Sequence, residues 1–289
     1  MPTRSKYLAL LVVLIWGVNF VVIDAGVADV PPLLFLAIRF TLVAFPAILF
    51  VPRPGIGFWR VLGIGAFMSL AQFSLLYLAL ALGMPAGLAS LVLQIQVVFS
   101  VMLSALFLGE RPSRRALIGI LIGSAGLVIV AVASGLGVTA IPFALTIGAA
   151  LGWAIGNTLS RRAKAASGLS LVVWSALVVP VPTALLSLLI DGPDAIVASI
   201  GSFTVVSLLS TLYTVVLASF VGYGIWNTLL ARHPASAVTP FALLIPIVGI
   251  LAAWLLRGEQ PGVGQLVGGA VMLGGVAYAM LERRPRLVS

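Results

Sequence analysis

The stretch 85-PAGLASLVLQIQVVFSVMLSALFLGERPSRRALIGILIGSAGLVIV-130 decides the fold, because it occurs twice. Adding 149 to its residue numbers gives a second copy that crosses two apolar runs without a gap. The second copy repeats the residue type at Pro234, Ala235, Gly258, Glu259, Pro261, Gly268 and Gly275. Internal repetition on this scale predicts a doubled structural unit. We therefore look for function where the two units meet.

Composition indicates the class of protein. The chain is 62% hydrophobic and 8% charged, with a mean hydropathy of +1.24, whereas soluble domains carry roughly 25% charged residues. The apolar runs approach the roughly 20 residues that a membrane-spanning helix needs. Lipid offers backbone groups no hydrogen bonds, so such runs must be helical. The sequence predicts an all-α integral membrane protein. It contains no cysteine, which excludes disulfides and thiolate chemistry, and we expect no cofactor or metal.

We predict ten transmembrane helices. They fall at about 7–24, 32–51, 61–82, 85–108, 114–134, 140–160, 170–190, 204–231, 234–256 and 261–281. Each unit crosses the membrane five times, which is an odd number, so the second unit has the opposite orientation in the membrane. We therefore expect a 5+5 inverted-topology repeat in one membrane domain. The first unit is 1–136 and the second is 137–289. The connector 191–203 is long enough to hold a short interfacial helix.

The placement of charge predicts the orientation, because basic residues gather on the cytoplasmic side of a membrane. With the N-terminus inside, the outer connections hold Arg257 alone. The acidic residues at outer ends are Asp24, Asp29, Asp191 and Asp194. The inner segments collect Arg4, Lys6, Arg53, Arg60, Arg111, Arg114, Arg115, Arg161, Arg162, Lys164, Arg232, Arg283, Arg284 and Arg286. Both termini are predicted to be cytoplasmic. The net charge of +9 then reflects topology and anionic lipid, and we expect no nucleic-acid partner.

Four motifs carry a resemblance to a known family. They are WGVNFVV at Trp16, IRF around Arg39, the GMPAGLASLVLQ segment and the LGERPS helix end. In this order they resemble EamA-type members of the drug/metabolite transporter superfamily, and among these the bacterial exporters of aromatic amino acids or of cysteine and O-acetylserine. The resemblance covers essentially the whole chain. It implies ten helices in a 5+5 inverted repeat, a central cavity, and export from the cytoplasm across the bacterial inner membrane.

The fourth span departs from the wider family. Many members carry a proline where this chain reads Gln94-Ile95-Gln96, whereas the second copy has Pro246 at the place equivalent to Val97. Pro240 and Pro246 are predicted to kink the ninth span and to act as a gating hinge. Ser90 and Gln94 share one face of the fourth span. Another face holds Gln96, Ser100 and Ser104, and we expect only one of the two faces to point at the cavity.

Polar and aromatic residues in mid-span mark the expected cavity wall, because a lipid-facing surface needs none of them. The candidate substrate-binding residues are Trp16, Asn19, Arg39, Tyr77, Gln94, Gln96, Trp153, Asn157, Trp174, Tyr213, Tyr223, Trp226 and Asn227. Aromatic rings can stack on an apolar substrate while amides hydrogen-bond to its polar end. The alternative is that these amides hold helices together.

Arg39 leaves two roles open. It is the basic residue that lies deepest within a predicted span, where a charged group is costly and usually faces protein or a wet cavity. In one role it attracts a substrate carboxylate. In the other it is structural, binding backbone carbonyls or pairing with Asp24.

The expected function is secondary transport. We predict a broad-range exporter of aromatic and other neutral amino acids that works by alternating access. No acidic residue lies in mid-span, which favours exchange or facilitated efflux over obligatory proton coupling. The alternatives are a multidrug or cationic-metabolite exporter and, less favoured, a channel; the sequence lacks the groups of a membrane enzyme. The spacings Gly119-x-x-x-Gly123 and Gly264-x-x-x-Gly268 predict close helix contacts, within a monomer or in a weak homodimer.

Overall fold

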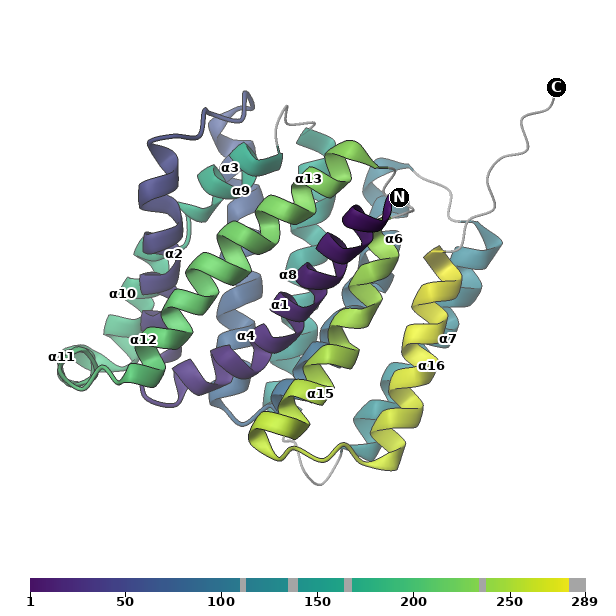
Figure 1. The fold of residues 1–289 in the computed structure, drawn as a ribbon. Coiled ribbons are helices and arrows are strands. Elements are labelled where there is room, and N and C mark those ends of the chain that lie inside the picture. Colours follow the sequence, from purple (N-terminus) through teal and green to yellow (C-terminus); the bar gives the residue numbers. More distant parts are fainter. Residues whose placement is uncertain (110–112, 135–139, 164–167, 234–237, 281–289) are drawn as a thin grey trace.

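The computed structural model describes residues 1–109, 113–134, 140–163, 168–233 and 238–280. Helix is the only regular structure in these ranges, which confirms the all-α prediction for them (Figure 1). In chain order the elements are α1 (Thr3–Val27), α2 (Pro32–Ile48), α3 (Phe58–Ile64), η1 (Gly65–Ala71), α4 (Gln72–Ala81), α5 (Ala86–Val92), η2 (Leu93–Ile95), α6 (Gln96–Leu108), α7 (Arg114–Ala133), α8 (Ala140–Ala163), α9 (Gly168–Ala176), α10 (Pro180–Ile190), α11 (Gly192–Gly201), α12 (Val205–Leu212), η3 (Tyr213–Tyr223), α13 (Gly224–Arg232), η4 (Thr239–Leu244), α15 (Ile245–Arg257) and α16 (Val263–Met280).

Several of these elements join into helices long and apolar enough to cross a membrane. Six such helices occur in the described ranges: Thr3–Val27, Phe58–Ala81, Ala86–Leu108, Ala140–Ala163, Leu169–Ile190 and Val205–Leu229. Shorter apolar helices are Pro32–Ile48, Leu117–Ala133, Phe241–Arg257 and Val263–Ala279. The connector after α10 contains α11, so the short helix expected there is present.

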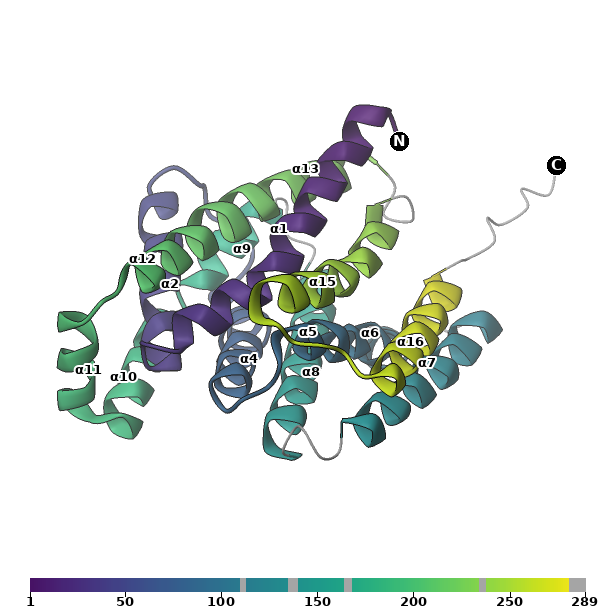
Figure 2. The same cartoon turned by 60° about the horizontal axis from the view of Figure 1, so that its bottom comes forward.

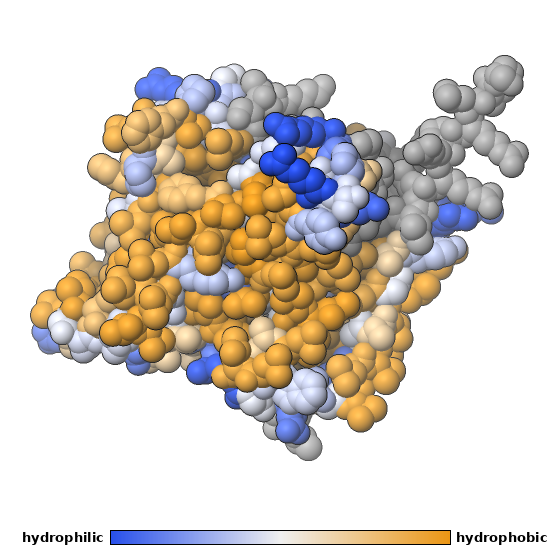
Figure 3. All heavy atoms as spheres, in the orientation of Figure 1, coloured by the Kyte–Doolittle hydropathy of each residue, from blue (hydrophilic) through white to orange (hydrophobic). Residues whose placement is uncertain are grey.

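One face of the molecule is apolar across its middle. Figure 3 shows on this face a broad hydrophobic belt, with hydrophilic residues at its upper and lower rims. The side chains of Phe45, Leu121 and Leu189 are each at least 70% exposed. Soluble monomers rarely expose contiguous apolar patches of this extent. The belt is therefore the surface expected of a protein surrounded by lipid.

Small residues let α1, α5 and α15 approach one another closely. A methyl group added at Gly17 of α1 would collide with Val248 of α15, and one added at Gly249 would collide with Ser90 of α5. Such contacts stabilise helix pairs in lipid, where association depends on packing. Gly17 and Gly249 thus allow these three helices to pack in close contact.

The glycines of α7 and α16 serve contacts within the chain. Carbon atoms added at Gly119 or Gly126 would collide with the backbone of α16, and those added at Gly268 or Gly275 with that of α7. Figure 2 shows this pair side by side at one edge of the molecule. The close contact predicted from the spacing is confirmed at Gly119 and Gly268.

Irregular helical turns recur at equivalent positions of the two copies. The π-helical segment η1 (Gly65–Ala71), moved by 149 residues, falls inside the π-helical η3 (Tyr213–Tyr223). The 3₁₀ turn η2 (Leu93–Ile95), moved likewise, falls inside the 3₁₀ segment η4 (Thr239–Leu244). Gly109 and Gly258, also 149 apart, end their helices in the left-handed conformation at φ 67° and 70°. Glycine adopts this conformation without a steric penalty. The repeat seen in the sequence is thus also present in the local backbone.

A central cavity open at one end

A cavity of about 720 Å³ lies in the middle of the bundle and receives side chains from both copies of the repeat. Its lining extends to one end of the helices, where it includes Ser104 of α6, Ser113 before α7 and Arg161 near the end of α8. This is the end at which α1 begins (Figure 1). The cavity therefore opens toward the side that the sequence predicts to be cytoplasmic.

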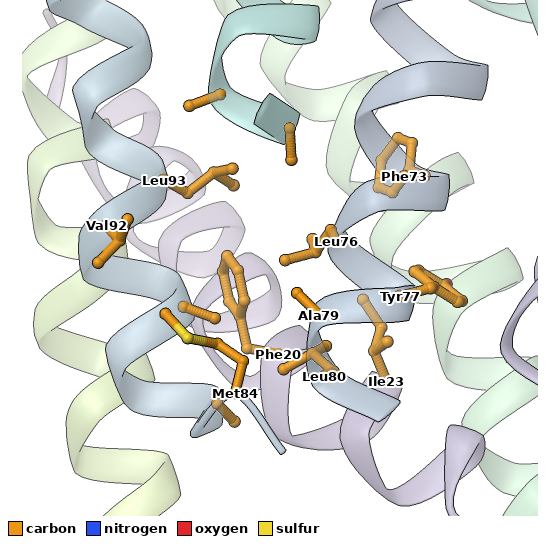
Figure 4. Packing of buried hydrophobic residues seen from close by; sticks show 14 of the residues in the cluster. Phe20, Ile23, Phe73, Leu76, Tyr77, Ala79, Leu80, Met84, Val92 and Leu93 are labelled. Atoms are coloured by element: carbon orange, nitrogen blue, oxygen red, sulfur yellow. The ribbon is translucent and has the colours of Figure 1, made fainter. Parts of the chain in front are cut away.

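An apolar floor closes the opposite end of the cavity. Phe20 of α1, Leu76 of α4 and Leu93 of η2 line the cavity and are each at least nine-tenths buried. Figure 4 shows Phe20 pointing between the helix that carries Leu76 and the helix that carries Leu93. Beneath this layer Met84 is 1% exposed and packs in the same core. We call Phe20, Leu76 and Leu93 the floor of the cavity.

A cluster of charged side chains lies beyond the floor. Arg257 Nη2 pairs with Asp24 Oδ2 at 2.6 Å. The two carboxylate oxygens of Glu259 each accept a hydrogen bond at 3.1 Å, one from the backbone N–H of Ala86 and one from that of Gly87. A carboxylate at this position satisfies free N–H groups and interacts favourably with the helix dipole. We call Asp24, Arg257 and Glu259 the outer cluster; it ties α1 and α5 to the end of α15.

One wall of the cavity is aromatic. The ring of Trp16 lies 5.1 Å from that of Tyr223 and 5.4 Å from that of Trp226, measured between centroids. Trp16 Nε1 donates to the carbonyl of Ala218 at 3.0 Å. Gly222 permits this approach, because a side-chain carbon there would collide with the indole. Tilted ring pairs at these distances are mutually attractive, so the wall is held in place before a ligand arrives.

Arg39 is buried at the edge of the cavity, with 2% of its surface exposed. Its Nη1 donates to the hydroxyl of Tyr77 at 2.8 Å and its Nη2 to Oγ of Ser219 at 3.3 Å. The guanidinium carbon lies 4.7 Å from the ring centre of Phe73. Both hydrogen-bond partners are uncharged. The predicted alternative of a pair with Asp24 is wrong, because Asp24 binds Arg257.

Ten of the thirteen predicted site residues meet at the cavity. The lining includes Trp16, Asn19, Arg39, Gln94, Gln96, Trp153, Asn157, Tyr223, Trp226 and Asn227. The other three lie in contacts between helices. Tyr77 is fully buried against Arg39. Trp174 Nε1 donates to the backbone carbonyl of Val51 at 3.1 Å, and the Tyr213 hydroxyl donates to the backbone carbonyl of Ile15 at 2.8 Å.

Sequence reasoning missed Gln72, which lines the cavity and is 4% exposed. Its position as an amide in the middle of the third predicted span was a signal that could have identified it. Arg161 also lines the cavity, at its mouth. From the sequence it is only one of the basic residues that predict the cytoplasmic side.

The fourth span directs residues of both predicted polar faces to the cavity. Gln94 lines it together with Gln96, Ser100 and Ser104, so the expectation that one face alone points inward is wrong. Ser90, the other residue of the first face, is fully buried and donates to the carbonyl of Gly87 at 2.6 Å. The 3₁₀ turn η2 lies between α5 and α6. Because such a turn has 3.0 residues per turn instead of 3.6, it rotates the following residues relative to a continuous α-helix.

The two proline positions of the ninth span lie where the helix is irregular. Pro246 occupies the first turn of α15 and is buried, and Pro240 lies in the 3₁₀ segment η4. Proline is tolerated in a first turn because its missing N–H would be unpaired there in any case. The irregular turn is consistent with the predicted kink, while movement about it stays a prediction. Glu110, the counterpart of Glu259, lies outside the described residues.

The sequence pattern of the EamA-like transporter family matches residues 4–132 and again 140–281. The chain belongs to the EamA-like transporter family. It is 43% identical to a probable amino-acid metabolite efflux pump of Salmonella typhimurium, over 99% of this chain and 98% of that protein. A protein of the same description in Escherichia coli is 42% identical, over 96% and 94% of the two chains.

Two further proteins are similar to this chain. A probable terminal-alkyne amino-acid exporter of Streptantibioticus cattleyicolor is 30% identical over 70% of this chain and 66% of its own length. A solved structure titled "Crystal structure of protein" is 22% identical and has a TM-score of 0.67, with 100% of this chain and 99% of that chain covered; at this identity it shows the fold alone. The chain is therefore a multi-pass membrane transporter rather than an enzyme.

Proposed function

We propose that this protein exports amino acids from the cytoplasm across the bacterial inner membrane by alternating access. The observation that carries the proposal is the central cavity, whose wall combines aromatic rings, amides and one buried guanidinium. Apolar surface with a few placed polar groups is typical of small-molecule sites. The volume suits a single amino acid with room to spare, which favours a broad range of aromatic and other neutral side chains. The names of the relatives at 42% and 43% identity support the same substrate class.

The proposed architecture is a 5+5 inverted repeat with units 1–136 and 137–289. Its support is the twofold family match and the recurrence of irregular turns 149 residues apart. In addition, the helix that ends at Gly109 does so near the cavity mouth, whereas its counterpart ends at Gly258 beside the outer cluster. Equivalent ends thus lie on opposite sides of the bundle. Transporters of this kind bind substrate near the midplane at the interface of the repeats.

In the proposed cycle the described state faces the cytoplasm. The cavity is open at the end where α1 begins, and the floor and the outer cluster close the other end. Outward opening requires that Phe20 separate from its neighbours and that the contacts of Glu259 with α5 break. The irregular turns at η2 and η4 are suitable hinges, because their helical hydrogen bonding is already perturbed. Both termini remain on the cytoplasmic side in this scheme.

The charge of the cavity argues against the two alternatives. Among the described residues the lining holds no aspartate or glutamate, so a lipophilic cation would meet Arg39 without a counter-ion. A channel needs a continuous path, whereas the floor is closed in this state. The same lack of acids favours exchange over obligatory proton coupling.

Counterflow in proteoliposomes tests the function directly. Vesicles preloaded with an unlabelled amino acid are given a labelled one outside, and the panel contains aromatic, sulfur-containing, hydroxylated, acidic and basic amino acids plus tetraphenylphosphonium. Saturable exchange of several neutral amino acids is the expected result. Inhibition by tetraphenylphosphonium alone would instead support drug export, and uptake without saturation or counterflow would support a channel.

A disulfide across the closed end tests alternating access. A carbon atom added at Gly87 would lie 3.2 Å from Cβ of Ala253, close to the roughly 3.5–4.5 Å of a disulfide. The chain contains no cysteine, so Gly87→Cys with Ala253→Cys introduces the only thiols. We expect oxidation to stop counterflow and reduction to restore it, with each single variant insensitive to oxidant. Full transport by the oxidised, cross-linked protein would show that this end need not open.

A further inference from the structure

Four shielded polar atoms without hydrogen-bond partners belong to residues of the cavity wall: Asn19 Oδ1, Arg39 Nε, Gln72 Oε1 and Asn227 Nδ2. Asn19, Arg39 and Gln72 are 9%, 2% and 4% exposed, whereas Asn227 is only partly buried. A buried polar atom that lacks a partner costs about 1–3 kcal/mol. Native proteins keep few such atoms, and each calls for an explanation. Their gathering at one cavity indicates that a ligand supplies the missing partners.

The side chains of Asn19, Arg39 and Gln72 all line the central cavity. A small recess of about 30 Å³ adjoins Arg39 and is also lined by Phe73, Ser219 and Tyr223. Gln72 precedes Phe73 on α4. Asn19 lies one helical turn after Trp16, whose ring contacts Tyr223. The recess is large enough to hold a water molecule or a small group such as a carboxylate.

The free edge of Arg39 suits a carboxylate. Its Nε has no partner, and the adjacent Nη2 has only the long contact of 3.3 Å to Ser219. These two nitrogens form one fork of the guanidinium, and such forks bind carboxylates through two parallel hydrogen bonds. Arginine stays protonated in proteins, and among the described residues no acidic side chain lines the cavity to neutralise it.

The two unpaired oxygens have the opposite preference. Asn19 Oδ1 and Gln72 Oε1 accept hydrogen bonds, and an ammonium group offers three donors. Because both amides are uncharged, they would bind an ammonium only while its charge is balanced by a carboxylate held nearby. The wall therefore complements a group that carries both charges a short distance apart.

We propose that Arg39, Asn19 and Gln72 form a subsite for the ammonium–carboxylate group of a free α-amino acid. Arg39 binds the carboxylate in the recess, and the two amide oxygens bind the ammonium. The Asn19, Arg39 and Gln72 atoms are shielded in the described conformation, so side-chain rotation accompanies binding. The subsite accepts any side chain that fits the aromatic wall but rejects amines, deaminated acids and N-acylated amino acids. This inference rests on the proposed export of amino acids and specifies which part of the substrate is recognised.

The test measures which competitors inhibit counterflow of the panel amino acid that exchanges fastest. Two sets of unlabelled competitors are used: phenylalanine with phenethylamine and 3-phenylpropionate, and leucine with isoamylamine and 4-methylpentanoate. In the wild-type protein we expect at least one amino acid to inhibit at a concentration about tenfold or more below either of its analogues. Equal inhibition by the amino acid and both analogues would overturn the subsite.

Substitutions of similar volume assign the two poles. Arg39→Met should remove the preference for phenylalanine over phenethylamine, whereas Gln72→Met and Asn19→Leu should remove the preference over 3-phenylpropionate. Ser74→Ala is the matched control, because Ser74 Oγ is also buried and unpartnered but does not line the cavity; it should change neither preference. If all variants weakened all competitors equally, the three residues would be structural and the proposal would be wrong.

The amide variants keep the test decisive if Arg39→Met fails to fold. Absence of counterflow for every amino acid by the wild-type protein would refute the export function itself, which is a different result from a loss of discrimination.

Discussion

Loosening the outer cluster is expected to shift the protein toward its outward-facing state. The perturbation is Glu259→Gln, which keeps one oxygen that can accept from the backbone N–H of Ala86 or Gly87 but removes the negative charge. Outward opening must separate α5 from the end of α15. Contacts that exist only in the closed state therefore set part of the free-energy difference between the two states.

The expected magnitude follows from the contacts. A carboxylate that caps a helix N-terminus contributes about 0.5–2 kcal/mol, and its interaction with the helix dipole accounts for about 0.3–1 kcal/mol. Glu259→Gln should therefore cost about 1 kcal/mol, or roughly a fivefold change in the ratio of states, and Glu259→Ala about 2 kcal/mol, or roughly 30-fold. Asp24→Asn should change the ratio less than fivefold, because the Arg257 side chain is 43% exposed and exposed pairs are worth about 0–1 kcal/mol.

The assay is thiol labelling from outside. Val97 lines the cavity, and Val97→Cys supplies the only thiol in a chain without cysteine. A membrane-impermeant maleimide added outside right-side-out vesicles reaches this thiol only in the outward-facing state. We expect labelling to rise in the order wild type, Asp24→Asn, Glu259→Gln, Glu259→Ala.

Asp194→Asn is the matched control, because it removes an acidic residue at the same end but on α11. It should label at the wild-type rate. Unchanged labelling in both Glu259 variants would refute the reasoning, since it would mean that the outer cluster does not hold this end closed.

Three further outcomes are expected. Trp153→Ala and Tyr223→Ala should each raise the half-saturation concentration about 2–10-fold, since ring contacts are worth about 0.5–1.5 kcal/mol; unchanged saturation in both would remove them from the site. Gly126→Leu should destabilise the protein by about 1–3 kcal/mol, because the backbone of α16 occupies the space that the new side chain needs. Gly274→Ala is the control: a side-chain carbon there meets no atom within 4 Å, so the melting temperature in detergent should stay unchanged. Exchange of a neutral amino acid should proceed at the same rate under a potassium diffusion potential, because a zwitterion carries no net charge; a strong dependence would indicate a charged transported species.

Much of the fold could be predicted because lipid imposes a simple rule on each segment. A run such as that in α1 must be helical and must be long enough to cross, and both properties can be read from consecutive residues. The glycines at 109 and 258 marked helix ends for the same local reason, and both adopt a positive φ. The offset of 149 residues likewise needed no knowledge of contacts.

The site could be predicted only in part, because a polar residue in mid-span has two ways to avoid lipid. Trp153 faces the cavity while Trp174 binds a backbone carbonyl, and Tyr223 lines the cavity while Tyr213 does not. From the sequence Trp174 is a weaker candidate than Trp153, but Tyr213 and Tyr223 are placed on the same helix face. Tyr213 and Tyr223 both lie in η3, and its π-helical turns alter the helix rotation in a way that regular helical spacing does not predict. For Trp153 and Trp174, which lie on different helices, the packing of each helix decides.

By itself, the sequence determined that this protein is a helical membrane protein with an internal repeat. The length of each apolar segment and its lack of charged residues are properties of consecutive residues, so they require no knowledge of contacts between helices. The tertiary structure alone decided that Arg257 pairs with Asp24, that Glu259 caps α5, and that Gln72 joins Arg39 and Asn19 at one cavity. These contacts join residues far apart in the chain. They depend on how helices pack against one another, and packing is a property of the assembled bundle rather than of any one helix.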